Sequence, residues 1–331
     1  MHPRTLFSYD KDNVIREGDT VLIYEKHDLA KQVVITPGAY YSAQKGVVKH
    51  EDIIQSGERY GTKIYTSNKR SCVTILRPTS DMYTRNLAQR TQILYTPDIS
   101  QVLMRLELRP GVLVCESGTG SGSLSTSIVK AVMPTGHLYT FEFNETRVGR
   151  AKTDFKTLGF DPYVTVTHRD VLNEGFLLET TEENAGGVAE GKIDAVFLDL
   201  PRPHVAVAHA FQVLRKKGKL CNFSPCIEQV QKVSQEMARL GFYNIVTIEC
   251  LSREIQTRRH MYTSLSKDTR PAESQKPEVK EEKEATKGEG IAQGRRNKKK
   301  EKDAKKVSKL VSMPQTEARG HTGYLTFAAK F

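Results

Sequence analysis

The chain has 331 residues, enough for two domains, and its 50 Lys and Arg exceed 39 Asp and Glu by a net charge of +11. No apolar run approaches the roughly 20 residues of a membrane helix, and Met1 to Asp12 lacks a hydrophobic signal core, so we expect a soluble, intracellular protein. Five scattered cysteines without a C-x-x-C pair argue against a disulfide framework and a structural metal site.

The N-terminal part of the chain has the pattern of a small β-barrel-like domain. Turn formers such as Pro37-Gly38 and Ser56-Gly57 separate short apolar runs. These runs predict strands at Thr20–Tyr24, Gln32–Ile35, Gly46–Val48, Lys63–Thr66 and Cys72–Leu76. Further on, Ile99, Val102, Leu103 and Leu106 have helical spacing, which predicts one amphipathic helix with a capped start over residues 98–108.

From Val112 onward, strand-like runs alternate with helical segments. The helices are indicated by apolar positions within 124–132, 148–158 and 230–240. This alternation predicts an α/β domain with a parallel sheet covered on both faces. The predicted strands are Val112–Cys115, Leu138–Phe141, Tyr163–Thr167, Ile193–Leu198, Lys219–Phe223, Ile245–Cys250 and, near the end, Tyr324–Ala328.

A charged segment interrupts the α/β part before its last strand. Residues 266–320 contain 16 basic and 10 acidic residues, 11 apolar residues and no aromatic residue. Such a composition buries too little apolar surface to offset the entropy of ordering. We therefore predict three parts: a β-domain over 1–80, an α/β domain over 81–265 plus 319–331, and a disordered basic insertion over 266–318. The cluster at Arg295–Lys300 is a nuclear import signal, an RNA-contacting arm or a solvated loop.

A glycine-rich loop, Glu116–Ser123, follows the first strand of the α/β part. Its G-x-G-x-G spacing differs from the G-x-G-x-x-G that seats a pyrophosphate. A carboxylate at Glu116 would repel phosphates but suits a cationic ligand such as S-adenosylmethionine. Glu142 and Asp170 follow the next two strands, where they could accept ribose hydroxyls and an adenine amino group. This combination favours S-adenosylmethionine over NAD and over a plain tight turn.

Asp199 follows the fourth strand, so it should project into the same cleft. A carboxylate there could hold the exocyclic amine of a purine and stabilise the positive charge that develops when a ring nitrogen is methylated. The alternative role is a cap for the next helix. A rival chemistry would use Cys226 as the nucleophile for methylating carbon 5 of a pyrimidine, although a free cysteine is more often a small buried residue.

Several long motifs resemble one family, the catalytic subunit of eukaryotic tRNA (adenine-58-N1)-methyltransferase. They occur in the same order as in that family and cover most of residues 13–262 plus the last strand. The motifs are Arg90–Tyr95, Val114–Ser123, Phe197–Asp199, Phe223–Gln231 and His321–Ala328. The residues after Asp199 depart from the family, and neither Arg202 nor His204 receives a role from it.

The resemblance implies a class I, Rossmann-like methyltransferase domain that methylates N1 of an adenosine in the tRNA T-loop, with Asp199 as the catalytic carboxylate. It also implies a heterotetramer of two such chains and two related non-catalytic RNA-binding subunits. We expect nuclear localisation, and T-loop-like sites in mRNA are a further candidate substrate. A non-catalytic RNA-binding scaffold is the remaining alternative. Pattern and resemblance together predict cofactor contacts from Leu94, Glu116, Gly118, Gly120, Ser121, Gly122, Ser123, Glu142, Arg147, Asp170, Val171 and Asp199.

Overall fold

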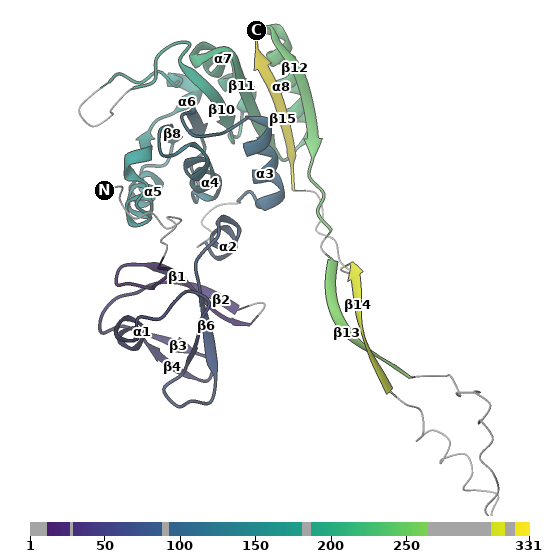
Figure 1. Ribbon diagram of the computed structural model, residues 1–331. Helices are drawn as coiled ribbons and strands as arrows, with labels where there is room; N and C mark the ends of the chain where they lie inside the picture. The colour runs from purple at the N-terminus through teal and green to yellow at the C-terminus, as the bar shows by residue number, and fades with distance from the viewer. Residues whose placement is uncertain are drawn as a thin grey trace, which may run out of the picture. The chain divides into compact units, whose positions relative to one another are not determined.

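The computed structural model describes residues 12–26, 29–87, 93–180, 187–253, 255–263, 306–314 and 322–331. The chain forms two compact units, one of Met1–Leu251 with His321–Phe331 and the other of Ser252–Gly320. Figure 1 shows both units and labels most of their helices and strands. Within the described ranges, we find no helix that combines the length and the apolar character needed to cross a membrane.

The N-terminal part is built from short antiparallel strands around one small core. The four-stranded sheet has the order β2-β1-β6-β5, and its strands are β1 (Thr20–Lys26), β2 (Leu29–Val34), β5 (Lys63–Tyr65) and β6 (Cys72–Leu76). A separate pair joins β3 (Tyr40–Ala43) to β4 (Gly46–Lys49), and helix α1 (His50–Ser56) follows. The predicted strands are therefore confirmed. The sequence pattern missed β3 and α1, because α1 has only seven residues and no side-chain cap at its start.

A seven-stranded sheet forms the centre of the larger part, in the order β12-β15-β11-β10-β7-β8-β9. Strands β9, β8, β7, β10 and β11 pair in parallel, whereas β15 runs antiparallel between β11 and β12. The predicted parallel sheet is thus confirmed for its main part. The strands are β7 (Leu113–Ser117), β8 (His137–Glu142), β9 (Val164–His168), β10 (Ile193–Leu198), β11 (Leu214–Ser224), β12 (Phe242–Glu249) and β15 (Tyr324–Lys330).

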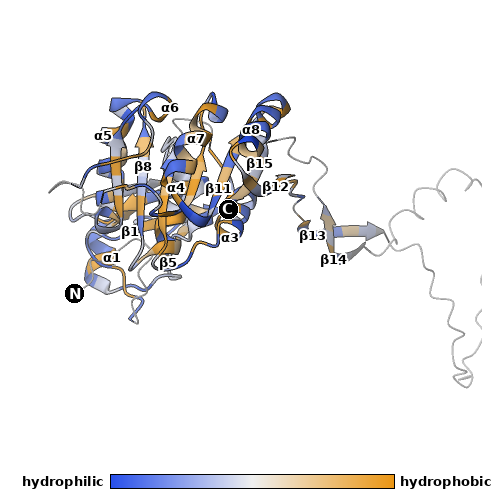
Figure 2. Ribbon diagram, turned by 90° about the horizontal axis from the view of Figure 1, so that it is seen from above, coloured by the Kyte–Doolittle hydropathy of each residue, from blue (hydrophilic) through white to orange (hydrophobic). Residues whose placement is uncertain are grey.

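Helices cover both faces of this sheet. Because successive strand residues point to opposite faces, Phe197 lies in one core with residues of α3, α4 and α5, and Val196 lies in the other with residues of α7 and α8. Figure 2 shows the strands mostly hydrophobic and the outer sides of α5 and α8 hydrophilic. The helices are α2 (Ser80–Asn86), α3 (Thr96–Arg105), α4 (Ser123–Val132), α5 (Glu145–Thr157), α6 (Val171–Glu174), α7 (Pro203–Val213) and α8 (Ile227–Arg239), with a 3-10 turn η1 at Asp161–Tyr163.

Helix α3 differs from its prediction at both ends. It begins at Thr96, and the N-cap residue Tyr95 makes no side-chain cap bond, so the predicted capped start is wrong. The Thr96 hydroxyl donates instead to Asp81 of the preceding helix α2. The helix stops at Arg105 because Glu107, two residues later, adopts a left-handed φ of 55°.

The second unit contains a hairpin where the composition predicts disorder. Strand β13 (Ile255–Thr263) pairs antiparallel with β14 (Lys306–Pro314) over its whole length. The expectation of a disordered segment over 266–318 is therefore wrong for the β14 residues, while residues 264–305 and 315–318 lie outside the described residues. The reason is that β14 contains Val307, Leu310 and Val311, and averaging over the long charged segment hides this short strand-forming run.

Candidate active site

A cavity of about 650 Å³ lies at the carboxyl ends of the central strands. Every predicted site residue lines it except Gly122, which precedes helix α4 and faces the Phe155 ring instead. Carboxyl ends of parallel strands are where ligands bind in open α/β sheets, and the order of the strands brings β7, β8 and β10 together there. The residues predicted from scattered strand ends therefore share one site.

The glycine loop is shaped by left-handed backbone at Gly118, Gly120 and Gly122, with φ values of 98°, 54° and 77°. Side chains rarely adopt such backbone, which explains why glycine stands at each position. At Gly118 space is the second constraint, because a Cβ there would lie 2.3 Å from the carbonyl oxygen of Asp199. The loop after β7 thus packs directly against the loop after β10.

Glu116 is buried beneath the glycine loop, with 1% of its surface exposed. Its Oε2 accepts hydrogen bonds from the hydroxyls of Ser125 at 2.6 Å and Thr140 at 2.7 Å. Burial raises its pKa to about 7, and these two hydrogen bonds oppose the shift. Because Glu116 also lines the cavity, it can present negative charge to a bound cation.

Glu142 fastens the glycine loop from the neighbouring strand. Its Oε2 accepts the N–H of Gly120 at 3.1 Å, and its Oε1 accepts the N–H of Asn144 at 3.0 Å. The guanidinium of Arg147 lies 3.4 Å from Oε1. The carboxylate therefore organises the loop, and only its remaining lone pairs are free for ribose hydroxyls. That contact remains a prediction.

Asp170 caps the short helix α6 at the edge of the cavity. Its Oδ1 accepts the N–H of Leu172 at 3.0 Å, and its Oδ2 accepts from the Asn173 side chain at 2.7 Å. These contacts fix the carboxylate that was predicted to accept an adenine amino group. Val171, the next residue, is buried and supplies apolar surface to the same wall.

Asp199 directly follows strand β10 and lies against the glycine loop. Its backbone N–H donates to the Ser117 carbonyl at 2.9 Å. Burial and the nearby Glu142 charge raise the pKa of the carboxyl to about 6. The N-cap of α7 is Arg202, so the alternative role of Asp199 as a helix cap does not hold.

Cys226 is exposed and lies outside the cavity lining, although its neighbour Pro225 belongs to that lining. It occupies the N-cap position of α8 without a side-chain cap bond. A nucleophile for a pyrimidine ring would have to face the same space as the methyl donor. The geometry therefore gives the Cys226 mechanism no support.

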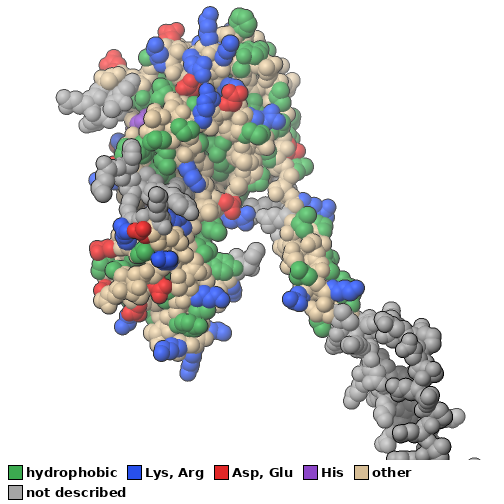
Figure 3. Space-filling model, viewed as in Figure 1, with side chains coloured by type: hydrophobic (Ala, Val, Ile, Leu, Met, Phe, Trp, Pro, Cys, Tyr) green, Lys and Arg blue, Asp and Glu red, His purple; other side chains and the backbone are tan. Residues whose placement is uncertain are grey.

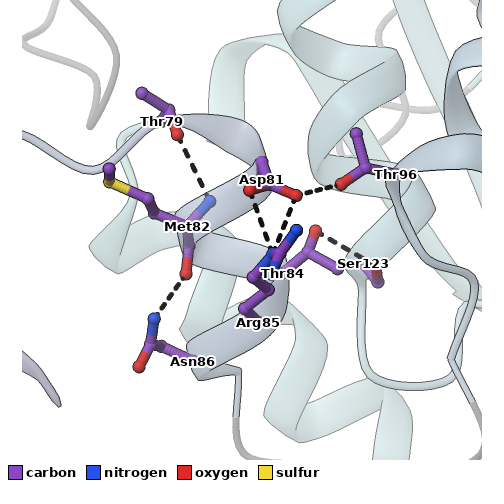
Figure 4. A network of polar contacts seen from close by, with 8 residues as sticks. All are labelled: Thr79, Asp81, Met82, Thr84, Arg85, Asn86, Thr96 and Ser123. Carbon is purple, nitrogen blue, oxygen red and sulfur yellow. Dashed lines mark hydrogen bonds and ion pairs between the residues drawn. The ribbon is translucent and has the colours of Figure 1, made fainter. Parts of the chain in front are cut away.

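Leu94 and Ser123 connect the cavity to helix α2. The Ser123 hydroxyl lies 3.0 Å from the Leu94 carbonyl and 3.3 Å from the Thr84 hydroxyl. Figure 4 shows Thr84 and Ser123 side by side within a set of polar contacts around α2. The segment that carries Leu94 is therefore attached to the first turn of α4, next to the glycine loop.

Sequence reasoning missed part of the cavity wall. Phe143 directly follows Glu142, so its place after a strand end was a usable signal. Gln229 is contributed by α8, and its amide donates to the Pro201 carbonyl at 3.0 Å. No local pattern indicates that contact. The other unpredicted lining residues are Ile93, Ser117, Thr119, Leu124, Phe141, Arg169, Leu172, Phe197, Leu200, Pro201, Arg202, Phe223 and Pro225.

Sequence comparison gives matches over nearly the whole chain. The family model of the tRNA methyltransferase complex GCD14 subunit matches residues 71–330. The catalytic subunit of tRNA (adenine(58)-N(1))-methyltransferase from Dictyostelium discoideum is 40% identical over 96% of this chain and 97% of that relative. The catalytic subunit from Kluyveromyces lactis is 33% identical over 97% of this chain and 88% of the relative.

Solved structures show the same fold at lower identity. An S-adenosylmethionine-dependent O-methyltransferase from Thermotoga maritima has a TM-score of 0.70 and 22% identity, covering 96% of this chain and 95% of that structure. The tRNA methyltransferase TrmI from Aquifex aeolicus has a TM-score of 0.65 and 22% identity, covering 96% and 99%. The predicted Rossmann-like methyltransferase fold is thus confirmed.

Proposed function

The chain belongs to the family of the tRNA methyltransferase complex GCD14 subunit, and on that premise we propose that it methylates N1 of adenosine 58 in the T-loop of tRNA. The observation that supports the proposal most is the backbone contact between the glycine loop and the segment of Asp199, because it brings this loop and a carboxyl group to the same cavity. The methyl donor in this proposal is S-adenosyl-L-methionine.

The cavity fits this cofactor in charge and in shape. Four carboxyl groups line it, and a sulfonium and an ammonium group are cations that such groups attract. The glycine loop offers backbone that a ligand can approach closely, since Gly118 and Gly120 carry no Cβ. When bound, the cofactor supplies an electrophilic methyl group. The four carboxyl groups belong to Glu116, Glu142, Asp170 and Asp199.

Asp199 is the residue to which we assign the chemical step. Its carboxylate accepts a hydrogen bond from the exocyclic amine of adenine and so directs the adjacent ring nitrogen N1 toward the methyl group. Methylation of N1 places positive charge on the ring, and a fixed carboxylate stabilises that charge as it develops. With its pKa at about 6, Asp199 is mostly ionised at neutral pH.

We assign the chain to a heterotetramer with a related, non-catalytic RNA-binding subunit, and we place it in the nucleus. The names of its relatives support a partner, because they are called catalytic subunits. In Figure 3, Lys and Arg side chains lie near Asp and Glu over much of the larger unit, whereas the β13–β14 hairpin, whose strands contain no acidic residue, shows Lys and Arg alone. T-loop-like sites in mRNA belong to the same proposal as further substrates.

The proposal is tested by methyl transfer from labelled S-adenosyl-L-methionine to unmodified tRNA, with and without the partner subunit. We expect incorporation with the partner and little without it, while titration shows that the chain alone binds the cofactor. Absence of cofactor binding would contradict the cofactor assignment. Equal incorporation by the isolated chain would contradict the need for a partner.

A further inference from the structure

Three arginines line the cavity, and they differ in their partners. Arg147 lies 3.4 Å from the Glu142 carboxylate. Arg169 lies 4.0 Å from Glu174 and also donates to the Leu177 carbonyl. The guanidinium of Arg202 is exposed and makes no hydrogen bond or ion pair with any other described residue. Arg202 is therefore the cation of this cavity that remains available to a ligand.

The position of Arg202 indicates which ligand it could meet. The paired arginines come from the β8 and β9 side of the cavity, where the predicted cofactor residues Glu142 and Asp170 lie. Arg202 comes from the loop after β10, beside Leu200, Pro201 and Asp199. It therefore lies on the side where the methyl acceptor approaches, and an S-adenosyl-L-methionine molecule has no phosphate for it.

The loop that carries Arg202 is held by two hydrogen bonds and by two prolines. The Asp199 N–H bonds to the Ser117 carbonyl, and the Gln229 side chain bonds to the Pro201 carbonyl. Pro201 and Pro203 restrict the backbone on either side of Arg202. The guanidinium therefore begins from a fixed base, which lowers the entropy lost when it binds an anion.

An acceptor in this cavity must bring a phosphate past several carboxyl groups. Asp199 and Glu142 attract an amine or a cationic ring, but they repel the backbone phosphates of RNA. A planar guanidinium matches two phosphate oxygens in geometry and charge. The step of three residues from Asp199 to Arg202 separates their Cα atoms by at most roughly 11 Å. The base and a phosphate of one nucleotide can therefore reach the side chains of Asp199 and Arg202 together.

We propose that Arg202 binds a phosphate next to the target adenosine and thereby sets how deeply the base enters the cavity. This inference rests on the proposed function, because it takes the acceptor to be a nucleotide within RNA. It makes Arg202 a positioning residue, whereas Asp199 acts on the base. Neither the comparisons nor the sequence motifs assign this role.

The test removes one charge on each side of the contact. Wild-type and Arg202→Ala chains, each with the partner subunit and saturating S-adenosyl-L-methionine, are titrated with tRNA that carries a neutral methylphosphonate on the 5′ or the 3′ side of adenosine 58. One of the two modified tRNAs should bind wild type about tenfold more weakly, a loss typical of one charge-assisted contact. For Arg202→Ala, modified and unmodified tRNA should bind equally.

Arg150→Ala is the matched control, because Arg150 is exposed on α5 and lies outside the cavity lining. This variant should show the same methylphosphonate penalty as wild type. A penalty of equal size in wild type and Arg202→Ala at both positions would overturn the inference. Nucleoside analysis of the wild-type reaction tests the proposed function separately, since tRNA that binds without yielding 1-methyladenosine would overturn that function and not this contact.

Discussion

Gly118 and Asp199 meet through their backbones, at a separation that leaves no room for a Cβ on Gly118. That atom would lie 2.3 Å from the Asp199 carbonyl oxygen, and the Asp199 N–H bonds to the carbonyl of Ser117 next to it. Neighbouring parallel strands β7 and β10 create this contact. One contact therefore sets the distance between the proposed cofactor loop and the proposed catalytic carboxylate.

Replacing Gly118 with alanine should damage binding and folding together. The new Cβ meets backbone that cannot move aside, and the residue has a left-handed φ of 98°. We expect the Kd for S-adenosyl-L-methionine to rise at least about tenfold and the free energy of unfolding to fall by roughly 1–3 kcal/mol. Calorimetric titration and urea denaturation measure the two effects.

Gly149→Ala supplies the control for that experiment. Gly149 lies within α5 and has nothing within 4 Å of an added Cβ. Because alanine favours a helix, this variant should bind the cofactor normally and gain up to about 1 kcal/mol of stability. Equal values of Kd and of the free energy of unfolding for the two alanine variants would contradict the claim that the close contact at Gly118 supports cofactor binding and folding.

The rate of methyl transfer should depend on the ionisation of Asp199. Its carboxyl has a pKa raised to about 6 by burial and by the Glu142 charge. We expect kcat/KM for tRNA to rise with pH through that value and to fall about tenfold per pH unit below it, because the protonated acid has no negative charge with which to stabilise the ring as it becomes cationic. The measurement is a pH profile at constant ionic strength. An Asp199→Asn variant that retains the same inflection would assign it to another group.

Glu116 should make the stability of the fold depend on pH. Its folded-state pKa of about 7 lies above the ordinary 4.5, so folding favours the protonated acid. The protonated Glu116 side chain therefore contributes to the free energy of unfolding below pH 4.5, and this contribution is lost as the pH rises through 7. The free energy of unfolding of Glu116→Gln, measured by urea denaturation, should therefore increase relative to that of wild type between pH 5 and pH 8, by on the order of 1–3 kcal/mol. A constant difference between the two proteins would contradict this prediction.

The central sheet could be predicted because its strands are nearly continuous apolar runs, as in Ile193–Leu198, where both faces are buried. The cavity residues could be predicted where chemistry and position coincide, as for Glu142 at the end of β8. The antiparallel course of β15 could not, because strand direction depends on pairing between distant segments and the local pattern of Tyr324–Lys330 carries no sign of it.

The remaining residues of the site depend on tertiary contacts. The Gln229 side chain bonds to Pro201, which is 28 residues earlier in the chain, and no spacing rule indicates such a pair. The sequence motifs give Arg202 no role. Only the structure distinguishes its guanidinium from those of Arg147 and Arg169, which form ion pairs. At β14 the composition gave a wrong prediction of disorder, because it was averaged over the whole charged segment and so concealed a short strand-forming run.

Removal of the charged segment between the hairpin strands should leave the larger unit intact. Replacing residues 266–304 with a short Gly-Ser turn keeps β13, β14 and the return of the chain to β15. Because β15 pairs with both β11 and β12, the sheet needs that return but not the segment itself. The melting temperature should be unchanged in differential scanning calorimetry. Insoluble protein would show that the segment contributes to folding.

The central claim is that Asp199 acts on an adenine ring, and product analysis of two variants tests it most directly. Wild type, Asp199→Ala and Cys226→Ala, each with the partner subunit, are given labelled S-adenosyl-L-methionine and tRNA, and the nucleosides are separated. We predict 1-methyladenosine from wild type and Cys226→Ala, and almost none from Asp199→Ala although it still binds the cofactor. A 5-methylpyrimidine product that survives Asp199→Ala and disappears in Cys226→Ala would contradict the account.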